Sequence, residues 1–515
     1  MSFDTSFYYR LTNNFTGKEK ALDVLPDGSG LLKIADIGNY SGQFWRLVAL
    51  DGGKYALRTW YLGEAFSLDI INDGINTTPH LAETTNVAGQ HWTATPWGDG
   101  TFRLTNDFTG PDRHLDVYSD GLRPTLATGD YTGQHWTLTK ITSITANVAI
   151  PDLEPKTNTW MSEGPTDFGV FVKPIGTVKA LMIFVDFPDA PHGDIDAAAT
   201  AKHLLGDGKA QKLLNSQSYG NLTLDVTVKS DLGWRRMPQG HAQYGSKTFE
   251  QHRDYIAVAA GLFPGSEVKF ADYALVFIVS PPNGGFDLSP AFNAIPPTGA
   301  HSPSGEIRHA VTFGKDSYNN RYINLIHETG HVFGLPDLYP YASGGAETSK
   351  AGCWPIMSDI FHSMNFLGWH RHKNGWLVPS RKTYLSQETP EWYITLSPLR
   401  GAFGVSMLVL PLDNAVKPSK VLVAEVVEPV LGTDDKQWGE GILVYTVDAT
   451  VESGNSPIQI VPKKTSSSSY YGYLYEAPYV VGDMMTHTEG SVSVTLTVLQ
   501  KFGSSYNVKV VYKRQ

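Results

Sequence analysis

Two histidines, a glutamate and an aspartate lie within eleven residues of one another, in the pattern H-E-x-x-H-x-x-G-x-x-D. On a helix, His327 and His331 project from one face, close enough to bind one metal ion. Glu328 lies on the adjoining edge, where it can polarise a metal-bound water without being a ligand. Gly334 is expected to end the helix and turn the chain back, so that Asp337 supplies a third ligand. The pattern predicts Zn²⁺ held by His327, His331 and Asp337, with Glu328 as the catalytic base.

A methionine and further histidines follow this pattern. Met357 lies in the segment 353–359 and is expected to pack beneath the imidazoles as an apolar floor. His362 and His370 are secondary candidates for stabilising a tetrahedral oxyanion. The alternative is that His327 and His331 are a core pair on a buried helix with their hydrogen bonds satisfied, and that Met357 is an ordinary core residue.

These motifs resemble those of metzincin-type zinc peptidases, with Asp337 where a third histidine is usual and Met357 in a segment that looks like the Met-turn. Three further segments, 181–189, 218–222 and 366–369, make residues 175 to 380 similar to the immune-inhibitor-A-like metallopeptidases. The resemblance implies a secreted-type zinc endopeptidase that takes protein or peptide substrates in a cleft over the metal.

A threefold repeat occupies the first 141 residues. Gln-x-Trp occurs at Gln43, Gln90 and Gln134, and a Leu-Asp-Val/Ile triplet precedes each copy. Short alternating segments with Gly, Asp and Asn turns lie between these motifs and predict strands. Three propeller blades cannot close a ring of the usual ~4–8, whereas three four-stranded units can close a trefoil barrel with each Trp in its core.

The repeats resemble ricin-B-type β-trefoil lectins, and the Tyr-Ser/Thr-Gly-Gln-x-Trp form resembles the fungal branch. The resemblance implies glycans as partners, an Asp that accepts hydrogen bonds from sugar hydroxyls, and an aromatic ring that stacks on the sugar. The carried-over pairs are Asp23 with Tyr40, and Asp116 with Tyr131. Asp69 is expected to bind less well, because repeat two has Val87 in place of the Tyr. The alternative is that the repeated Asp only caps a turn.

The remaining pattern predicts a multidomain chain. We expect an all-β trefoil over 1–141, a Pro-punctuated connecting segment over 142–174, and an α/β (α+β) zinc-peptidase domain over 175–390. A C-terminal β-sandwich-like domain over 391–515 is expected to support the peptidase.

Composition and net charge make some classes of partner and structure unexpected. The chain has 515 residues, a net charge of −10 and one cysteine, Cys353, so a nucleic-acid partner and a disulfide framework are not expected. No signal peptide and no apolar run long enough to span a bilayer are visible, which suits cytoplasmic storage, leaderless release or a mature secreted form. The sequence predicts a lectin-targeted zinc endopeptidase. The alternatives are a defence agglutinin with an inert protease domain, and a glycosidase, for which no carboxylate pair is marked.

Overall fold

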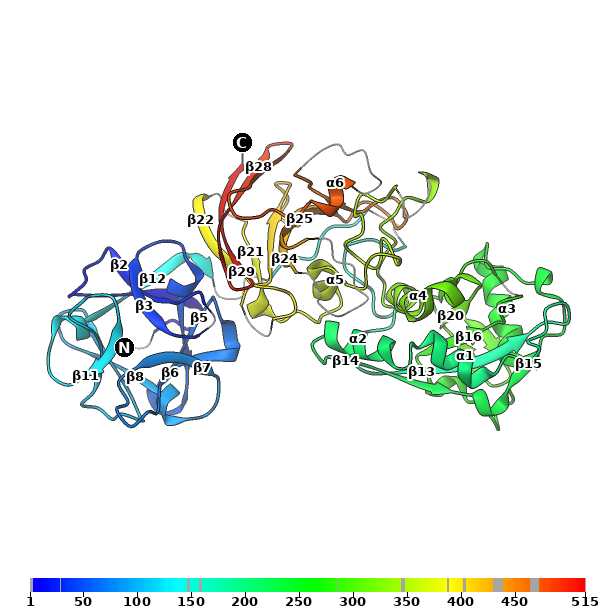
Figure 1. Ribbon diagram of the computed structural model, residues 1–515, viewed down its shortest axis with the longest axis horizontal. Coiled ribbons are helices and arrows are strands. Elements are labelled where there is room, and N and C mark those ends of the chain that lie inside the picture. The colour runs from blue at the N-terminus through cyan, green and yellow to red at the C-terminus, as the bar shows by residue number, and fades with distance from the viewer. Residues whose placement is uncertain are drawn as a thin grey trace.

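The structure is a computed structural model that describes residues 3–27, 29–145, 149–156, 160–284, 286–343, 348–386, 389–401, 404–428, 439–463 and 472–514. Figure 1 shows three bodies in a row, with the C-terminal body lying between the N-terminal and the middle one. We call them the trefoil, the tail domain and the middle domain. Within the described residues, no helix is both long and apolar enough to span a membrane.

The N-terminal body is a six-stranded closed barrel with three two-stranded hairpins. The barrel strands are β1 (Phe7–Asn13), β4 (Trp45–Ala49), β5 (Tyr55–Thr59), β8 (Trp92–Pro96), β9 (Phe102–Asn106) and β12 (Trp136–Thr145). The hairpins are β2 (Lys20–Val24) with β3 (Leu32–Asp36), β6 (Phe66–Ile70) with β7 (Pro79–Glu83), and β10 (His114–Val117) with β11 (Pro124–Ala127). This strand order confirms the predicted β-trefoil.

The three repeats use equivalent contacts to close the trefoil. Each Trp of a Gln-x-Trp motif is buried, and its indole N–H donates to a leucine carbonyl oxygen at 2.7–3.0 Å. The donor and acceptor pairs are Trp45 with Leu22, Trp92 with Leu68, and Trp136 with Leu115. The motif therefore fixes the core of the barrel, because a buried indole N–H needs an acceptor.

The middle domain is built on a mostly parallel sheet with strand order β14-β13-β16-β20-β17, and β15 also pairs with β13. The strands are β13 (Gly176–Asp186), β14 (Leu222–Val228), β15 (Trp234–Arg236), β16 (Leu275–Val279), β17 (Ala291–Asn293) and β20 (His309–Phe313), with β17 antiparallel to β20. A separate hairpin joins β18 (Ala300–Ser302) to β19 (Gly305–Ile307). The helices are α1 (Ala197–Leu204), α2 (Lys209–Gln217), α3 (Phe249–Gly261), α4 (Asp316–Val332) and α5 (Gly368–Lys373).

The central strand β13 is continuously apolar from Ala180 to Val185, because both of its faces are buried there. Met182 and Phe184 belong to the core shared with α1, α2 and α4, while Leu181 and Ile183 belong to the core shared with α3. A parallel strand covered on both faces reads as a continuous apolar run, as the sequence predicted here.

The tail domain has two antiparallel-rich sheets that share one core. The first has the order β21 (Lys382–Tyr384), β23 (Met407–Pro411), β24 (Lys420–Val427), β25 (Gly441–Asp448) and β26 (Ile458–Ile460). The second has the order β22 (Thr389–Leu396), β29 (Ser505–Arg514), β28 (Val492–Phe502) and β27 (Met484–Glu489), and the short helix α6 spans Gly472–Tyr475. Because β21 already belongs to the first sheet, this domain begins ahead of the expected boundary at residue 391.

The first tail sheet is buried on both faces, which joins the tail and middle domains. Along β24, Val421 and Val423 belong to the core shared with the middle domain, while Leu422 and Ala424 belong to the core between the tail sheets. The tail domain thus packs on the middle domain through the side chains of its own central strands.

The trefoil docks on the tail domain through its first repeat and the start of its second. Phe44 is fully buried and lies against Trp60, and both rings meet Trp392 of β22, with centroids 6.4 and 6.1 Å away. Repeats two and three carry His91 and His135 where repeat one carries Phe44. Phenylalanine in place of histidine therefore distinguishes repeat one, which packs against another domain.

The described part of the connecting segment is packed rather than free. Phe171 and Val172 are buried, and the Val172 N–H donates to the carbonyl oxygen of Val332 at 3.0 Å, at the end of α4. This part of the expected linker therefore packs against the middle domain.

Candidate metal centre and candidate glycan sites

Helix α4 carries the H-E-x-x-H pattern and ends as the sequence predicts. Leu325 and Ile326 are fully buried and anchor the helix in the core. Gly334 has a φ of +86°, and the Leu335 N–H donates back to the carbonyl oxygen of Gly330 at 3.0 Å. Glycine adopts this left-handed conformation without strain, so it ends the helix and redirects the chain towards Asp337.

The three predicted ligand atoms converge. His327 Nε2 lies 3.2 Å from His331 Nε2, and Asp337 Oδ1 lies 3.1 Å from the first and 3.3 Å from the second. Ligands ~2.0–2.1 Å from a tetrahedral zinc stand about 3.3 Å apart. The triangle therefore has the size that three ligands of one zinc ion require.

The hydrogen bonds of the imidazoles leave their inner nitrogens free to bind a cation. His327 Nδ1 donates to the carbonyl oxygen of Ile356 at 2.9 Å, and His331 Nδ1 donates to that of Leu335 at 2.7 Å. A neutral imidazole that donates from Nδ1 has a lone pair on Nε2. Two lone pairs and a buried carboxylate oxygen without a hydrogen-bond partner, Asp337 Oδ1, thus face one another. A bound cation satisfies all three, so these residues fit zinc.

Burial and charge set the protonation of the carboxyl groups. Burial acts to raise the pKa of Asp337, but His331 and His327 hold it well below its usual value, so Asp337 is an anion. Burial raises the pKa of Glu328 to about 8, against an opposing effect of His327. The backbone N–H of Ala291 in β17 acts weakly to lower this pKa.

Met357 packs against the turn of α4 that lies between the two histidines. It is fully buried, and a β-carbon added at Gly330, between the two histidines, would lie 2.7 Å from its sulfur. The Met357 carbonyl oxygen also accepts a hydrogen bond from the Leu338 N–H, next to Asp337. Gly330 is needed because the methionine passes directly beneath this turn of the helix.

The two histidines proposed for the oxyanion lie in different surroundings. His370 is fully buried and pairs with the buried Glu163 of the connecting segment at 3.0 Å, so we withdraw it as a residue that contacts substrate. His362 is partly exposed, and its Nδ1 lies 2.7 Å from Asp359 Oδ2. This contact orients His362, and its role in the reaction stays a prediction.

In the trefoil, the three repeated aspartates share one arrangement. Gln43, Gln90 and Gln134 donate through Nε2 to the Oδ2 atoms of Asp23, Asp69 and Asp116, respectively, at 2.9–3.2 Å. Each Oδ1 accepts the backbone N–H of the next residue at 2.7–2.8 Å. Asp23 and Asp116 are buried, whereas Asp69 is half-buried, so the Asp has a structural role in every repeat.

The same arrangement explains why glycine precedes each Gln. A β-carbon at Gly42, Gly89 or Gly133 would overlap the Oδ1 atom of the aspartate of its own repeat. Glycine at this place in each repeat therefore follows from its close packing against the aspartate.

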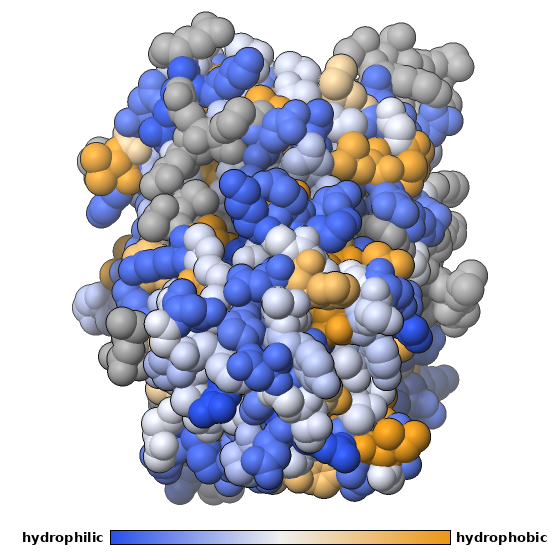
Figure 2. Space-filling model, turned by 90° about the vertical axis from the view of Figure 1, so that its left-hand side faces the viewer, coloured by the Kyte–Doolittle hydropathy of each residue, from blue (hydrophilic) through white to orange (hydrophobic). Residues whose placement is uncertain are grey.

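The two tyrosines differ in exposure. Tyr40 is half-buried at the domain interface, with its ring centroid 5.2 Å from that of Tyr393, and the neighbouring Asn39 donates to the Glu391 carbonyl oxygen. Tyr131 is 62% exposed and lies over Gly129. Figure 2 shows that the trefoil end of the molecule is largely hydrophilic with scattered apolar side chains. Repeat three therefore presents the more open ring.

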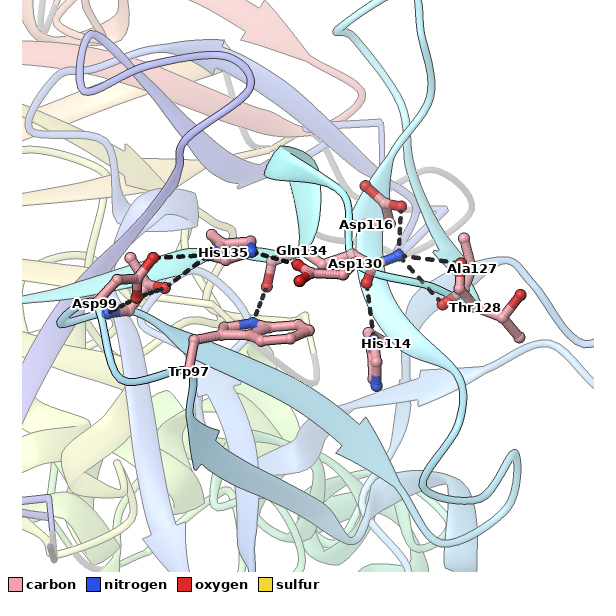
Figure 3. Close-up of polar contacts among 10 residues, drawn as sticks. Trp97, Asp99, His114, Asp116, Ala127, Thr128, Asp130, Gln134 and His135 are labelled. Atoms are coloured by element: carbon pink, nitrogen blue, oxygen red, sulfur yellow. Dashed lines mark hydrogen bonds and ion pairs between the residues drawn. The ribbon is translucent and has the colours of Figure 1, made fainter.

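A histidine cluster that the sequence did not single out supports repeat three (Figure 3). His135 lies between Asp99 and Asp130, 2.8 and 2.7 Å from their carboxylate oxygens, and stacks on Trp97 at 4.6 Å. Burial acts to lower the pKa of His135, but the two aspartates raise it overall. Asp130 adjoins Tyr131, so the cluster holds the loop that carries the ring. The histidine of the Gln-His-Trp motif in repeat three is the sequence feature from which this cluster could have been inferred.

No protein-family model and no curated protein matches the chain. Among solved structures, the designed threefold-symmetric protein ThreeFoil is 24% identical, with a TM-score of 0.23 over 26% of this chain and 99% of its own. A Polyporus squamosus lectin bound to a human-type influenza-binding epitope is 16% identical, with a TM-score of 0.23 over 27% of this chain and 50% of its own. The Vibrio vulnificus hemolysin/cytolysin β-trefoil lectin, with N-acetyl-D-lactosamine bound, is 14% identical, with a TM-score of 0.21 over 27% of this chain and 96% of its own. The trefoil assignment rests on the strand order itself.

Proposed function

We propose that the chain is a zinc-dependent endopeptidase carried on a glycan-binding trefoil. The observation that carries the proposal is the triangle of His327 Nε2, His331 Nε2 and Asp337 Oδ1, with both Nδ1 atoms engaged by carbonyl oxygens. A zinc ion held there would supply Lewis-acid chemistry towards water and a peptide carbonyl.

The edge of the middle sheet offers a place for a peptide. In the described residues, β17 pairs with β20 on one side, and no strand pairs with its outer edge. The Ala291 N–H, on that outer edge, reaches Glu328. An extended peptide that adds to an open strand edge gains main-chain hydrogen bonds, and here it would lie beside Glu328.

Each residue then has a task in peptide hydrolysis. Glu328 would accept the proton of the attacking water and return it to the leaving amine. His327, His331 and Asp337 would hold the metal, and the carbonyl oxygens of Ile356 and Leu335 fix the imidazole tautomers.

For the trefoil, we propose glycan binding with repeat three as the principal site. Asp116 is oriented by Gln134, and Tyr131 offers an open ring for the apolar face of a sugar. Repeat one keeps Asp23, but its Tyr40 packs against Tyr393. The lectin would hold the peptidase near glycosylated proteins.

Zinc analysis combined with a casein digest tests the peptidase. We expect about one zinc ion per chain, and digestion that a chelator stops and added zinc restores. A protein that binds glycans but holds no zinc and cuts no casein would instead be a carbohydrate-binding agglutinin with an inert middle domain.

Tyr131→Ala tests the glycan site. We expect binding on a glycan array to weaken about tenfold, since an aromatic platform contributes on the order of 1–2 kcal/mol. The melting temperature should hardly change, because the ring is 62% exposed. Tyr40→Ala is the matched control and should leave most glycan binding intact. If Tyr40→Ala abolished binding and Tyr131→Ala did not, the principal site would be in repeat one.

A further inference from the structure

The third metal ligand is held by a turn of the tail domain, which lies more than a hundred residues further along the chain. Ser453 Oγ accepts the backbone N–H of Asp337 at 2.9 Å, and the Gly454 N–H donates to the Asp337 carbonyl oxygen at 3.0 Å. Both tail residues belong to the turn 452–455, between β25 and β26. Another domain therefore holds both the backbone N–H and the carbonyl oxygen of Asp337.

The same turn also fixes the direction of the carboxylate. Tyr341 donates its hydroxyl to Asp337 Oδ2 at 2.7 Å, and its oxygen lies 3.3 Å from Ser453 Oγ. The Tyr341 N–H donates to the Gly454 carbonyl oxygen at 3.0 Å. The Tyr341 ring lies so close over Gly454 that a β-carbon there would overlap it. With Oδ2 held by Tyr341, Oδ1 is the atom that points to the imidazoles.

The other two ligands are positioned differently. His327 and His331 lie on one helix, and their Nδ1 atoms donate to Ile356 and Leu335 of the middle domain. Asp337 follows the helix in an irregular segment, where no regular backbone ladder sets its place. Its position depends on its partners in the turn.

We propose that the tail-domain turn 452–455 is part of the metal centre, in which Ser453 and Gly454 position Asp337 and so couple zinc binding to docking of the tail domain. This inference rests on the proposed function only in taking zinc as the metal. Partners that orient a metal ligand are typically worth ~10- to 100-fold in metal affinity. Because a ligand set completed by docking binds metal better when docked, zinc in turn stabilises the docked state.

Ser453→Ala is the direct test, with Zn²⁺ alone as the probe and its affinity measured by competition with a chromogenic chelator. We expect affinity to fall about 10- to 100-fold, and the rise in melting temperature on adding zinc to shrink. Ser453→Thr keeps the hydroxyl and should restore affinity. Thr450→Ala is the matched control, because Thr450 bonds to Asp448 at the start of the same connection without touching Asp337.

A second variant covers the case in which Ser453→Ala does not fold. Tyr341→Phe removes one hydroxyl from a side chain that is 61% exposed, and it should weaken zinc binding in the same range. Folded Ser453→Ala and Tyr341→Phe variants that bind zinc as tightly as the wild type would overturn the inference and leave the zinc site standing. A wild-type protein that binds no zinc would overturn both.

Discussion

Glu328→Ala should lower casein hydrolysis about 100-fold or more while the zinc content stays at the wild-type level. A positioned general base contributes ~10²–10⁴ to the rate, and a Glu328 carboxylate oxygen lies within 4.8 Å of the ring nitrogens that His327 and His331 offer to a metal. Zinc should remain, because the converging atoms belong to His327, His331 and Asp337. The measurement is initial rate per mole of bound zinc.

Glu328→Gln is the matched control for folding. The amide oxygen can still accept the Ala291 N–H, so the strand edge keeps its contact while the base is lost. Both variants should be equally inactive. Full activity per bound zinc in either of them would assign the proton transfer to another group.

Asp337→Ala should weaken zinc binding by more than the ~10- to 100-fold that the loss of an orienting partner costs, because it removes a ligand itself. The substitution leaves two imidazole lone pairs facing each other at 3.2 Å with no anion between them. Metal content after dialysis against a weak chelator should therefore fall to near zero, and activity should fall with it.

Asp359→Asn is the control for this prediction. Asp359 is a buried aspartate of the segment that contains Met357, but its oxygens accept the Phe361 N–H and contact His362. Zinc retention is expected in this variant. If zinc were lost from Asp359→Asn and kept in Asp337→Ala, the third ligand would have to be reassigned to Asp359.

The largest part of the metal centre could be predicted from the sequence because it is local. Spacing of four residues places His327 and His331 on one face of any helix, and glycine at position 334 permits the positive φ that ends it. The trefoil was equally accessible, since each Trp repeats with the motifs that surround it. In both cases the backbone geometry depends on a few neighbouring residues, so the residue types in the sequence indicate it directly.

The partners of those residues come from distant parts of the chain, and no periodic pattern in the sequence predicts them. His370 faces Glu163 from the connecting segment, Tyr40 packs on Tyr393, and Asp337 depends on Ser453. The continuous apolar runs of β24 and β25 showed that these strands are buried, but not that one face would meet the middle domain.

The sequence by itself thus determined the trefoil, helix α4 with its H-E-x-x-H pattern and the identities of the candidate ligands. The tertiary structure alone decided which histidine is interior, which repeat keeps an open ring, and which domain holds the third ligand. The reason is physical: helix spacing and turn chemistry act over a few residues. The docking of domains, by contrast, is decided by burial of apolar surface such as Phe44, Trp60 and Trp392, which any of several faces could have satisfied.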